Sequence, residues 1–488
     1  MAIGRGYSDR RRRGFASRWW LVPIALAALL IGGCAAGSSG GVHTASALRT
    51  PSAKPETPRW TLTWTSYHAD QTRTGAVPND KSAPDPASVL WRANLGGAVF
   101  GQPLIADHEV IAATERNRVV ALNPKTGAVI WSDSIGTPLT NVGEAAGCGD
   151  IDPLGITSTP VIDPATGAVF VVGEINDGGG VVHHELVAID IKTGSVLRSE
   201  NVDPPLPTGE RSITLLQRPG LAVANGRIYI GFGGNDGDCG HYHGWEVAVN
   251  ETGPEDMVSF EVASDGQGGA IWEAGGAPAI DSNGNLYVTT GNANPDPPEG
   301  GPDPKQYTES VVKLSPDLQV LASYKDRIAG GDEDLATGNP VLLPNGQVFA
   351  VGKTDVGYLL NQSNLSVVAK IPNVCDSNPD GGPAYVAASN SLFVPCSGGG
   401  IQVVHLTSHR AGARLSGANG APILIGSTVW ATLYSDGRLY EYNAATGARM
   451  QSLSIGSTIP HFASPSTAFG EVFVGTNGGV VAFAGPRP

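Results

Sequence analysis

The stretch from Val119 to Trp131 reads Val-Val-Ala-Leu-Asn-Pro-Lys-Thr-Gly-Ala-Val-Ile-Trp. Two apolar runs flank an Asn-Pro-Lys-Thr-Gly segment. This predicts two strands joined by a tight turn, with Gly127 supplying the backbone freedom that the turn requires. The pattern returns at residues 186–194 and 439–447. Recurrence of one strand–turn–strand unit predicts a repeat protein.

The composition is that of a folded, all-β protein. Of the 488 residues, 66 are Gly and 36 are Pro, and 41% are hydrophobic. The apolar content excludes a disordered chain, and the many turn formers suit short strands. Beyond the N-terminal segment, no long run has apolar residues at helical spacing without an interrupting Gly or Pro.

A second marker counts the repeats. A Pro opens each unit, where its missing N–H costs least, and a β-rich strand follows within about ten residues. Eight prolines fit this pattern: Pro103, Pro160, Pro219, Pro278, Pro340, Pro383, Pro422 and Pro465. The shorter intervals between them match the ~40–50 residues of a four-stranded propeller blade, and the longer ones indicate loop insertions in the first half. The sequence therefore predicts an eight-bladed β-propeller over residues 60–488.

The last unit lacks one strand. After Val472 the chain offers one further apolar run and stops at Pro488, without a counterpart of the strand that carries Trp131. A copy of that strand stands near the other end, at residues 88–95. We therefore expect this N-terminal strand to complete the last blade and close the ring.

The first 33 residues predict an export signal. Four arginines at residues 10–13 precede an apolar run at residues 19–31, and two glycines follow before Cys34. This order resembles a bacterial lipoprotein signal peptide, with cleavage before Cys34 and lipidation of its thiol. An ordinary signal peptide that contains a Cys is the alternative, and an Arg-Arg-Gly-Phe sequence leaves a twin-arginine route open. Residues 34–59, rich in Ser, Ala, Gly and Pro, then form a flexible tether, so we expect an extracytoplasmic lipoprotein of the cell membrane or envelope.

The charge excludes one class of partner. The formal net charge is -14, although the first 33 residues carry six Arg and one Asp. An acidic body of this size argues against a nucleic-acid partner.

Four cysteines remain after Cys34, an even number that suggests two disulfides in an exported chain. Cys375 and Cys396 stand on either side of one predicted hairpin, so we expect them to pair. Cys148 and Cys239 would then pair across neighbouring repeats.

The repeat resembles the tryptophan-docking motif of pyrroloquinoline quinone (PQQ)-type propellers, in which the Trp packs against the Gly-containing turn of an adjacent blade. Residues 67–75 are similar to the usual N-terminal segment of that family. The tryptophan of the motif is not present in every copy. The position equivalent to Trp131 is Arg198 in the second copy and Gln451 in the seventh. The resemblance implies the propeller fold. It leaves function open, because the family includes PQQ-dependent alcohol dehydrogenases and non-catalytic scaffolds, one of them the lipoprotein of the outer-membrane β-barrel assembly machine.

Four positions match the enzymes' segments in order. By resemblance, Asn292 is a calcium ligand, Asp332 is the catalytic base and Lys353 contacts the quinone, while Trp272 forms the floor under its ring. These roles suit the chemistry, which needs a hard cation, a carboxylate base and a cation near the quinone oxygens. For each residue a structural role is the alternative: a strand cap, a solvated turn carboxylate, a surface cation and interblade packing.

The departures from the enzymes are also clear. No adjacent Cys-Cys pair exists, and the calcium-binding Glu of the second blade has only Glu174 and Asp177 as nearby candidates. No Cys-x-x-Cys-His signature is present, so electrons would pass to an outside acceptor.

Two further features are a group of histidines and aspartates and an acidic segment. His241 and His243, with His183, His184, Asp150 and Asp152, are residue types that hold zinc or copper. The alternative is a disulfide-stapled loop with exposed histidines. Residues 294–304 read as an acidic, extended surface loop.

Two hypotheses for function follow. The first is a quinoprotein dehydrogenase-like oxidoreductase acting on small-molecule alcohols with PQQ and calcium. The second is a non-catalytic propeller scaffold that binds partner proteins at the cell envelope.

Overall fold

The computed structural model describes residues 62–78, 87–253, 257–294, 306–326, 332–456 and 458–484. The predicted signal, Cys34 and the tether lie outside these ranges. The described residues all belong to one compact unit, Pro58–Pro488. In the ranges above, no helix is both long and apolar enough to cross a membrane.

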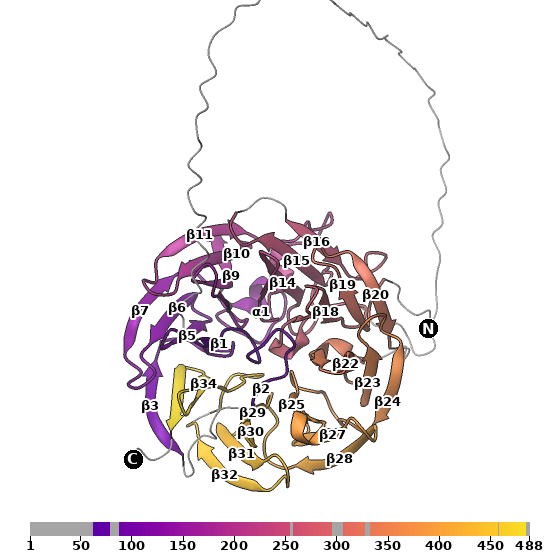
Figure 1. Ribbon diagram of the computed structural model, residues 1–488. Helices are drawn as coiled ribbons and strands as arrows, with labels where there is room; N and C mark the ends of the chain where they lie inside the picture. Colours follow the sequence, from indigo (N-terminus) through magenta and orange to yellow (C-terminus); the bar gives the residue numbers. More distant parts are fainter. Residues whose placement is uncertain are drawn as a thin grey trace, which may run out of the picture. The chain divides into compact units, whose positions relative to one another are not determined.

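Eight sheets are arranged radially, which confirms the predicted eight-bladed propeller (Figure 1). Blade 1 comprises β4 (Leu104–Ala106), β5 (Glu109–Thr114), β6 (Arg118–Leu122) and β7 (Val129–Ser134). Blade 2 comprises β8 (Val161–Asp163), β9 (Ala168–Gly178), β10 (Val181–Asp190) and β11 (Val196–Asn201). Blade 3 comprises β12 (Leu215–Leu216), β13 (Ala222–Ala224), β14 (Arg227–Gly234), β15 (Trp245–Asn250) and β16 (Val258–Glu261). Blade 4 comprises β17 (Ala279–Ile280), β18 (Leu286–Thr289), β19 (Ser310–Leu314) and β20 (Val320–Lys325).

The second half repeats the plan with shorter loops. Blade 5 comprises β21 (Val341–Leu343), β22 (Gln347–Val351), β23 (Val356–Asn361) and β24 (Val367–Pro372). Blade 6 comprises β25 (Ala384–Val386), β26 (Ser391–Pro395), β27 (Ile401–His405) and β28 (Arg410–Leu415). Blade 7 comprises β29 (Ile423–Ile425), β30 (Thr428–Leu433), β31 (Arg438–Asn443) and β32 (Arg449–Ser454), and blade 8 comprises β33 (Ser466–Ala468), β34 (Glu471–Thr476) and β35 (Gly479–Ala484). The loops hold α1 (Val142–Ala145) and the 3-10 turns η1 (Ser212–Thr214), η2 (Glu273–Gly275), η3 (Leu335–Thr337) and η4 (Ala387–Ser389).

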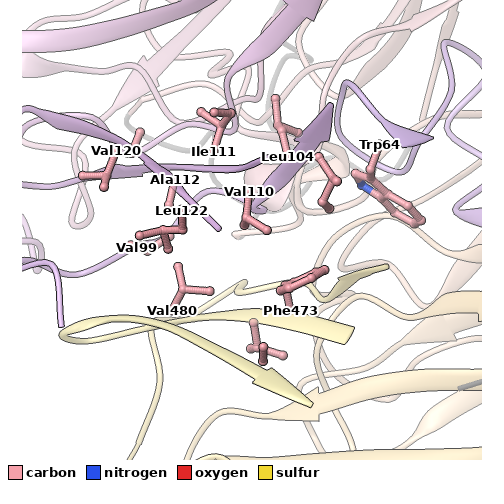
Figure 2. Packing of buried hydrophobic residues seen from close by; sticks show 14 of the residues in the cluster. Trp64, Val99, Leu104, Val110, Ile111, Ala112, Val120, Leu122, Phe473 and Val480 are labelled. Atoms are coloured by element: carbon pink, nitrogen blue, oxygen red, sulfur yellow. The ribbon is translucent and has the colours of Figure 1, made fainter. Parts of the chain in front are cut away.

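The N-terminal strand closes the ring as predicted. β3 (Ser88–Asn94) pairs antiparallel with β35, so that Trp91 lies opposite Ala482 and Asn94 opposite Gly479. Blade 8 is thus built from both ends of the described chain. Figure 2 shows the adjoining seam, where Phe473 and Val480 of blade 8 face Val110 of blade 1.

The tryptophans dock on glycines in the next blade. The Trp91 ring packs against Gly127, where a Cβ atom would come within 2.6 Å of it, and the Trp91 indole N–H donates to the Pro124 carbonyl at 2.7 Å. Trp131 makes the equivalent contact with Gly194 and donates to the Ile191 carbonyl at 2.8 Å.

Blades 2 and 7 lack the docking tryptophan, and the residue that replaces it in each makes a different contact with the next blade. Arg198 replaces the tryptophan in blade 2 and donates from Nη1 to the Asn250 carbonyl in the turn of blade 3, at 2.7 Å. Gln451 in blade 7 instead accepts the backbone N–H of Ala87 at 3.1 Å. Arg198 therefore preserves the donor to a neighbouring turn carbonyl even though the aromatic ring is lost.

One N-terminal segment also joins the inner strands of most blades. β1 (Leu62–Trp64) pairs with β4 of blade 1, and β2 (Ala76–Val77) pairs with β29 of blade 7, both near the centre of Figure 1. Between them, carbonyls of the segment accept backbone N–H groups from blades 2, 4, 5, 6 and 7, in the pairs Thr65–Ile162, Gln71–Ile280, Thr72–Leu342, Thr74–Tyr385 and Gly75–Leu424. The Gln71 side chain adds a bond to the Val223 carbonyl of blade 3. Residues 62–77 therefore fasten seven blades around the axis.

Both predicted disulfides are confirmed. Cys148 bonds to Cys239, which joins the loop after α1 to the β14–β15 loop of blade 3. Cys375 bonds to Cys396, between blades 5 and 6, and both cysteines are buried.

The docking contact predicts an asymmetry between two glycines. Gly127→Ala forces a Cβ into the Trp91 ring and strains a left-handed backbone, whose φ is 68°. We expect it to lower the free energy of unfolding by about 3 kcal/mol. Gly226 has a similar φ of 73° and nothing within 4 Å of its would-be Cβ, so Gly226→Ala should cost only about 1 kcal/mol. Chemical denaturation of both variants measures the difference, and equal losses would contradict the docking role.

Candidate functional site

The candidate site is a cavity of about 430 Å³, within the range of small-molecule sites. Loops from several blades form its wall. Asp236 and Asp238 come from the β14–β15 loop of blade 3, Trp272 from the approach to blade 4, and Lys353 from the β22–β23 loop of blade 5. His461 comes from the loop that enters blade 8.

Trp272 forms one wall of the cavity. Its indole N–H donates to the Gly234 carbonyl at 2.9 Å. At the preceding Gly233, a Cβ would lie 2.4 Å from the indole nitrogen. The absence of a side chain on Gly233 therefore lets the Trp272 ring lie close to β14, with the indole partly buried.

Lys353 binds two carboxylates. Its Nζ lies 2.8 Å from Asp334 Oδ2 and also contacts Asp332. The two acids differ sharply in exposure, because the Asp332 side chain is 70% exposed and the Asp334 side chain only 2%. The predicted base, Asp332, is therefore the exposed partner of Lys353, and the buried partner is Asp334, two residues further along the chain.

Asn292 joins this cluster through its backbone. The Asn292 N–H, just beyond β18, donates to Asp334 Oδ1 at 2.8 Å. At Gly291 a Cβ would come within 2.4 Å of the same oxygen, so only glycine allows Asp334 to approach. Three of the four predicted residues, Asn292, Asp332 and Lys353, thus meet around Asp334, and Trp272 lies in the same cavity wall as Asp334.

The pKa values follow from burial and this ion pairing. Burial raises the pKa of Asp334 to about 6, in spite of the charge of Lys353. For Asp332, burial also raises the pKa, but the hydrogen bonds with Lys353 and Asp334 and the charge of Lys353 together outweigh it, so the pKa of Asp332 is lowered. Burial alone would lower the pKa of Lys353, whereas the charge of Asp334 raises it. Lys353 is therefore held as an ammonium ion between two acids.

A second cation was not predicted from the sequence. Arg218 lines the cavity with its guanidinium between the rings of Phe100 and Phe462, at 5.4 and 4.8 Å from the ring centroids. One of its nitrogens donates to the His461 carbonyl at 3.0 Å. Burial lowers the pKa of Arg218 to about 10, which leaves it charged at neutral pH. Its position between blades 3, 1 and 8 carries no local sequence signal.

The two candidates for the missing calcium carboxylate lie in other clusters. Glu174 is buried, with Oε2 at 3.9 Å from His184 Nε2, and Asp177 bonds to His183 at 2.7 Å. The acids that line the cavity from blade 3 are instead Asp236 and Asp238, in the Gly/Asp-rich loop around Cys239.

The histidines do not assemble a metal centre. His243 bonds through Nδ1 to Glu210 at 2.5 Å and through Nε2 to the Gly266 carbonyl at 3.0 Å. His184 Nδ1 lies 2.8 Å from Asp203. Throughout the described ranges, no group of three or more His, Cys, Asp or Glu residues is arranged to hold a metal ion. The Cys148–Cys239 disulfide staples the β14–β15 loop, and His241 is exposed as the alternative expects, but His243 and His184 are buried, so the expectation of exposed histidines is wrong for these two. Residues 295–304 of the acidic loop lie outside the described ranges.

Comparisons with known proteins agree with the predicted resemblance. Residues 81–236 match the family model described as outer membrane protein assembly factor BamB. A quinone-type alcohol dehydrogenase subunit from Gluconacetobacter polyoxogenes is 28% identical over 165 residues, which are 33% of this chain and 20% of that relative. The chain therefore matches only one fifth of this relative's length. The resemblance to PQQ-type propellers is confirmed.

Solved structures show the same fold. The quinohemoprotein alcohol dehydrogenase of Comamonas testosteroni superposes with a TM-score of 0.68 at 16% identity, covering 87% of this chain and 81% of that chain. BamB from Moraxella catarrhalis superposes with a TM-score of 0.53 at 10% identity, covering 81% of this chain and 99% of that chain. At these identities the likeness concerns the fold alone.

Two buried glutamates predict a pH dependence of stability. Burial raises the pKa of Glu115 to about 7 and that of Glu273 to about 8, against 4.5 for each as a free side chain. The folded protein binds these protons more tightly than the unfolded chain. The resulting stabilisation is complete below pH 4.5 and is lost as pH rises through 7 and 8. We expect a Tm at least about 3 °C lower near pH 9 than near pH 5.

Glu273→Gln supplies the control, because a neutral amide has no proton to lose. Its Tm should fall less steeply with pH than that of the wild type when both are followed by calorimetry. A wild-type Tm that rises across this interval would contradict the assignment.

Proposed function

We propose that this chain is an extracytoplasmic PQQ-type propeller that binds a planar quinone in the cavity and oxidises small alcohols. The observation that carries the proposal is the convergence of Lys353, Trp272 and Asp334 on one cavity. Similarity to a quinone-type alcohol dehydrogenase subunit supports it.

The lining suits a flat, negatively charged ligand. Trp272 offers an aromatic surface for a fused ring, and Lys353 and Arg218 offer positive charge to quinone and carboxylate oxygens. When bound, the quinone supplies a two-electron acceptor for the hydrogen on the alcohol carbon. Electrons then leave to an external one-electron acceptor, which we propose because the chain carries no haem-attachment signature.

The charge balance favours a metal ion beside the quinone. The cavity lining has more carboxylates than cations. The cations are Lys353 and Arg218, and the five carboxylates are Asp150, Asp236, Asp238, Asp332 and Asp334. Burial and neighbouring acids raise the pKa of both Asp236 and Asp238, a sign of crowded negative charge. An anionic quinone would meet repulsion here unless a divalent cation joined it. We propose calcium, which prefers oxygen ligands, with Asn292 among its ligands. Because the described acids do not by themselves form a metal-binding group, oxygens of the bound quinone would have to complete the ligand set.

The titration that tests this proposal uses PQQ with and without Ca²⁺. We expect saturable binding that requires calcium, and at least about tenfold weaker binding in Lys353→Met and Trp272→Leu, because each removes a direct contact. Asn292→Ala should weaken the calcium dependence. Lys125→Met is a matched control, because this lysine is 55% exposed and ion-paired with Glu471 in blade 8.

The proposal fails if PQQ shows no saturable binding with calcium present, or if all cavity variants bind it like the wild type. Alcohol-dependent dye reduction in the same samples separates binding from turnover.

A scaffold that binds envelope proteins is the second candidate. The match of residues 81–236 to the BamB family model favours it. Exposed apolar pairs on outer strands also favour it: Val129 and Ile130 on β7, Val196 and Leu197 on β11, and Val367 and Val368 on β24. Outer strands offer unpaired edges to a partner. Crosslinking in cells should then capture a partner that the double variant Ile130→Asp/Leu197→Asp loses; capture by both forms alike would count against this surface.

Lipid attachment at Cys34 is part of the proposal. We expect the protein in the membrane fraction and Cys34→Ser in the soluble extracytoplasmic fraction, since the variant lacks the thiol that carries the lipid. Wild type recovered in the soluble fraction would contradict attachment.

A further inference from the structure

The cavity holds a second candidate proton acceptor on another wall. A dehydrogenase needs a group that takes the hydroxyl proton of the alcohol. Asp332 was predicted for this role, yet its carboxylate is bound to Lys353, which lowers its pKa and its basicity. Asp334 is bound by Lys353 and by the Asn292 N–H. Both acids of this cluster are therefore engaged before a substrate enters.

His461 is arranged differently. Its side chain is 51% exposed and lines the cavity, while Nε2 lies 3.4 Å from Oδ2 of Asp380, a carboxylate only 3% exposed. An acid behind an imidazole fixes the ring and its tautomer, as in other Asp–His pairs. With Nε2 directed to Asp380, the second ring nitrogen, Nδ1, remains available as the acceptor.

The surrounding residues hold the ring in place. The imidazole stacks on Phe462 with centroids 3.8 Å apart, and its plane meets the Tyr434 ring edge-on at 5.1 Å. Phe462 has a left-handed backbone, with φ of 68°, and packs over the Arg218 guanidinium. Strained backbone of this kind persists where the surroundings fix it, and it is concentrated at functional sites.

The charges around His461 come from three other elements. Asp380 precedes blade 6, Arg218 and Asp236 belong to blade 3, and the Tyr434 ring lies beyond β30 in blade 7. The charges of His461 and Lys353 both act on Asp236, which places this acid between the two sides of the cavity. Two acids, Asp380 and Asp236, and one cation, Arg218, thus border His461.

We propose that His461, oriented by Asp380, accepts the hydroxyl proton of the alcohol. This inference rests on the proposed function. The alcohol O–H bond breaks and its proton passes to Nδ1 of His461, while the hydrogen on the carbinol carbon leaves with its electron pair for the quinone. The alcohol is oxidised to a carbonyl compound and the quinone is reduced by two electrons; two equivalents of a one-electron dye take these electrons, and the proton of the transferred hydrogen and the proton on the imidazole pass to solvent. Asp380 is a positioning residue.

The kinetic test compares His461→Gln, Asp380→Asn and Asp332→Asn, with His241→Gln as an exposed histidine control. With PQQ, calcium, a primary alcohol and a dye, His461→Gln should lower kcat/KM by at least about 100-fold and abolish the acid limb of its pH profile. Asp380→Asn should shift that limb and lower kcat/KM by about tenfold, and Asp332→Asn should keep the limb. PQQ affinity should stay within about threefold of wild type in His461→Gln, which excludes a folding defect.

The outcomes separate this inference from the proposed function. If the wild type oxidises alcohols and His461→Gln retains its rate and pH profile, or if Asp332→Asn alone abolishes both, His461 is not the acceptor although the enzyme hypothesis stands. If the wild type neither binds PQQ nor turns over, the proposed function fails, and the role of His461 fails with it. Nitrogen-15 shifts of His461 give a readout without turnover: we expect a proton on Nε2 in the wild type, and a tautomer mixture in Asp380→Asn. A proton on Nδ1 in the wild type would overturn the proposal.

Discussion

Closure of the ring is the constraint on which the rest of the structure depends. A propeller sheet buries its faces only between two neighbours, so eight blades must meet without a gap. Two N-terminal pieces secure that meeting: β3 completes the last blade beside β35, and residues 62–77 bond to the inner strands of seven blades. The Trp91 and Trp131 contacts then fix how adjacent blades pack.

The cavity is a product of that closure. Its functional groups come from blades 3, 4 and 5 and from the loop that enters blade 8, and no single blade holds more than a part of them. Close approach depends on glycine at two places, Gly233 beneath Trp272 and Gly291 beside Asp334. The repeat therefore supplies a rigid frame, and the unrepeated loops supply charge and aromatic faces. The cavity lining holds more carboxylates than cations, and the proposed metal ion and anionic ring depend on that charge balance.

The sequence alone predicted the repeated part of the molecule and little of the rest. The strand–turn–strand unit indicated a repeat protein, and eight prolines that each precede a strand gave the number of blades. The missing last strand pointed to residues 88–95, and hairpin position paired Cys375 with Cys396. Trp272, Lys353, Asp332 and Asn292 could be chosen only by resemblance. The buried ion pair of Lys353 with Asp334 and the contact of His461 with Asp380 depend on how loops from distant parts of the sequence approach one another. No local sequence pattern predicts these approaches. The bonds of residues 62–77 to so many blades were likewise invisible, because they are made by backbone groups.

The central claim is that the cavity beside Trp272 is a quinone site completed by a cation. A crystal structure of the protein soaked with PQQ and Ca²⁺ tests it most directly. We expect a flat ring system against Trp272, its oxygens near Lys353 and Arg218, and one metal ion between the ring and the aspartates. A cavity that stays empty at saturating PQQ and Ca²⁺, or a quinone bound elsewhere on the propeller, would contradict it.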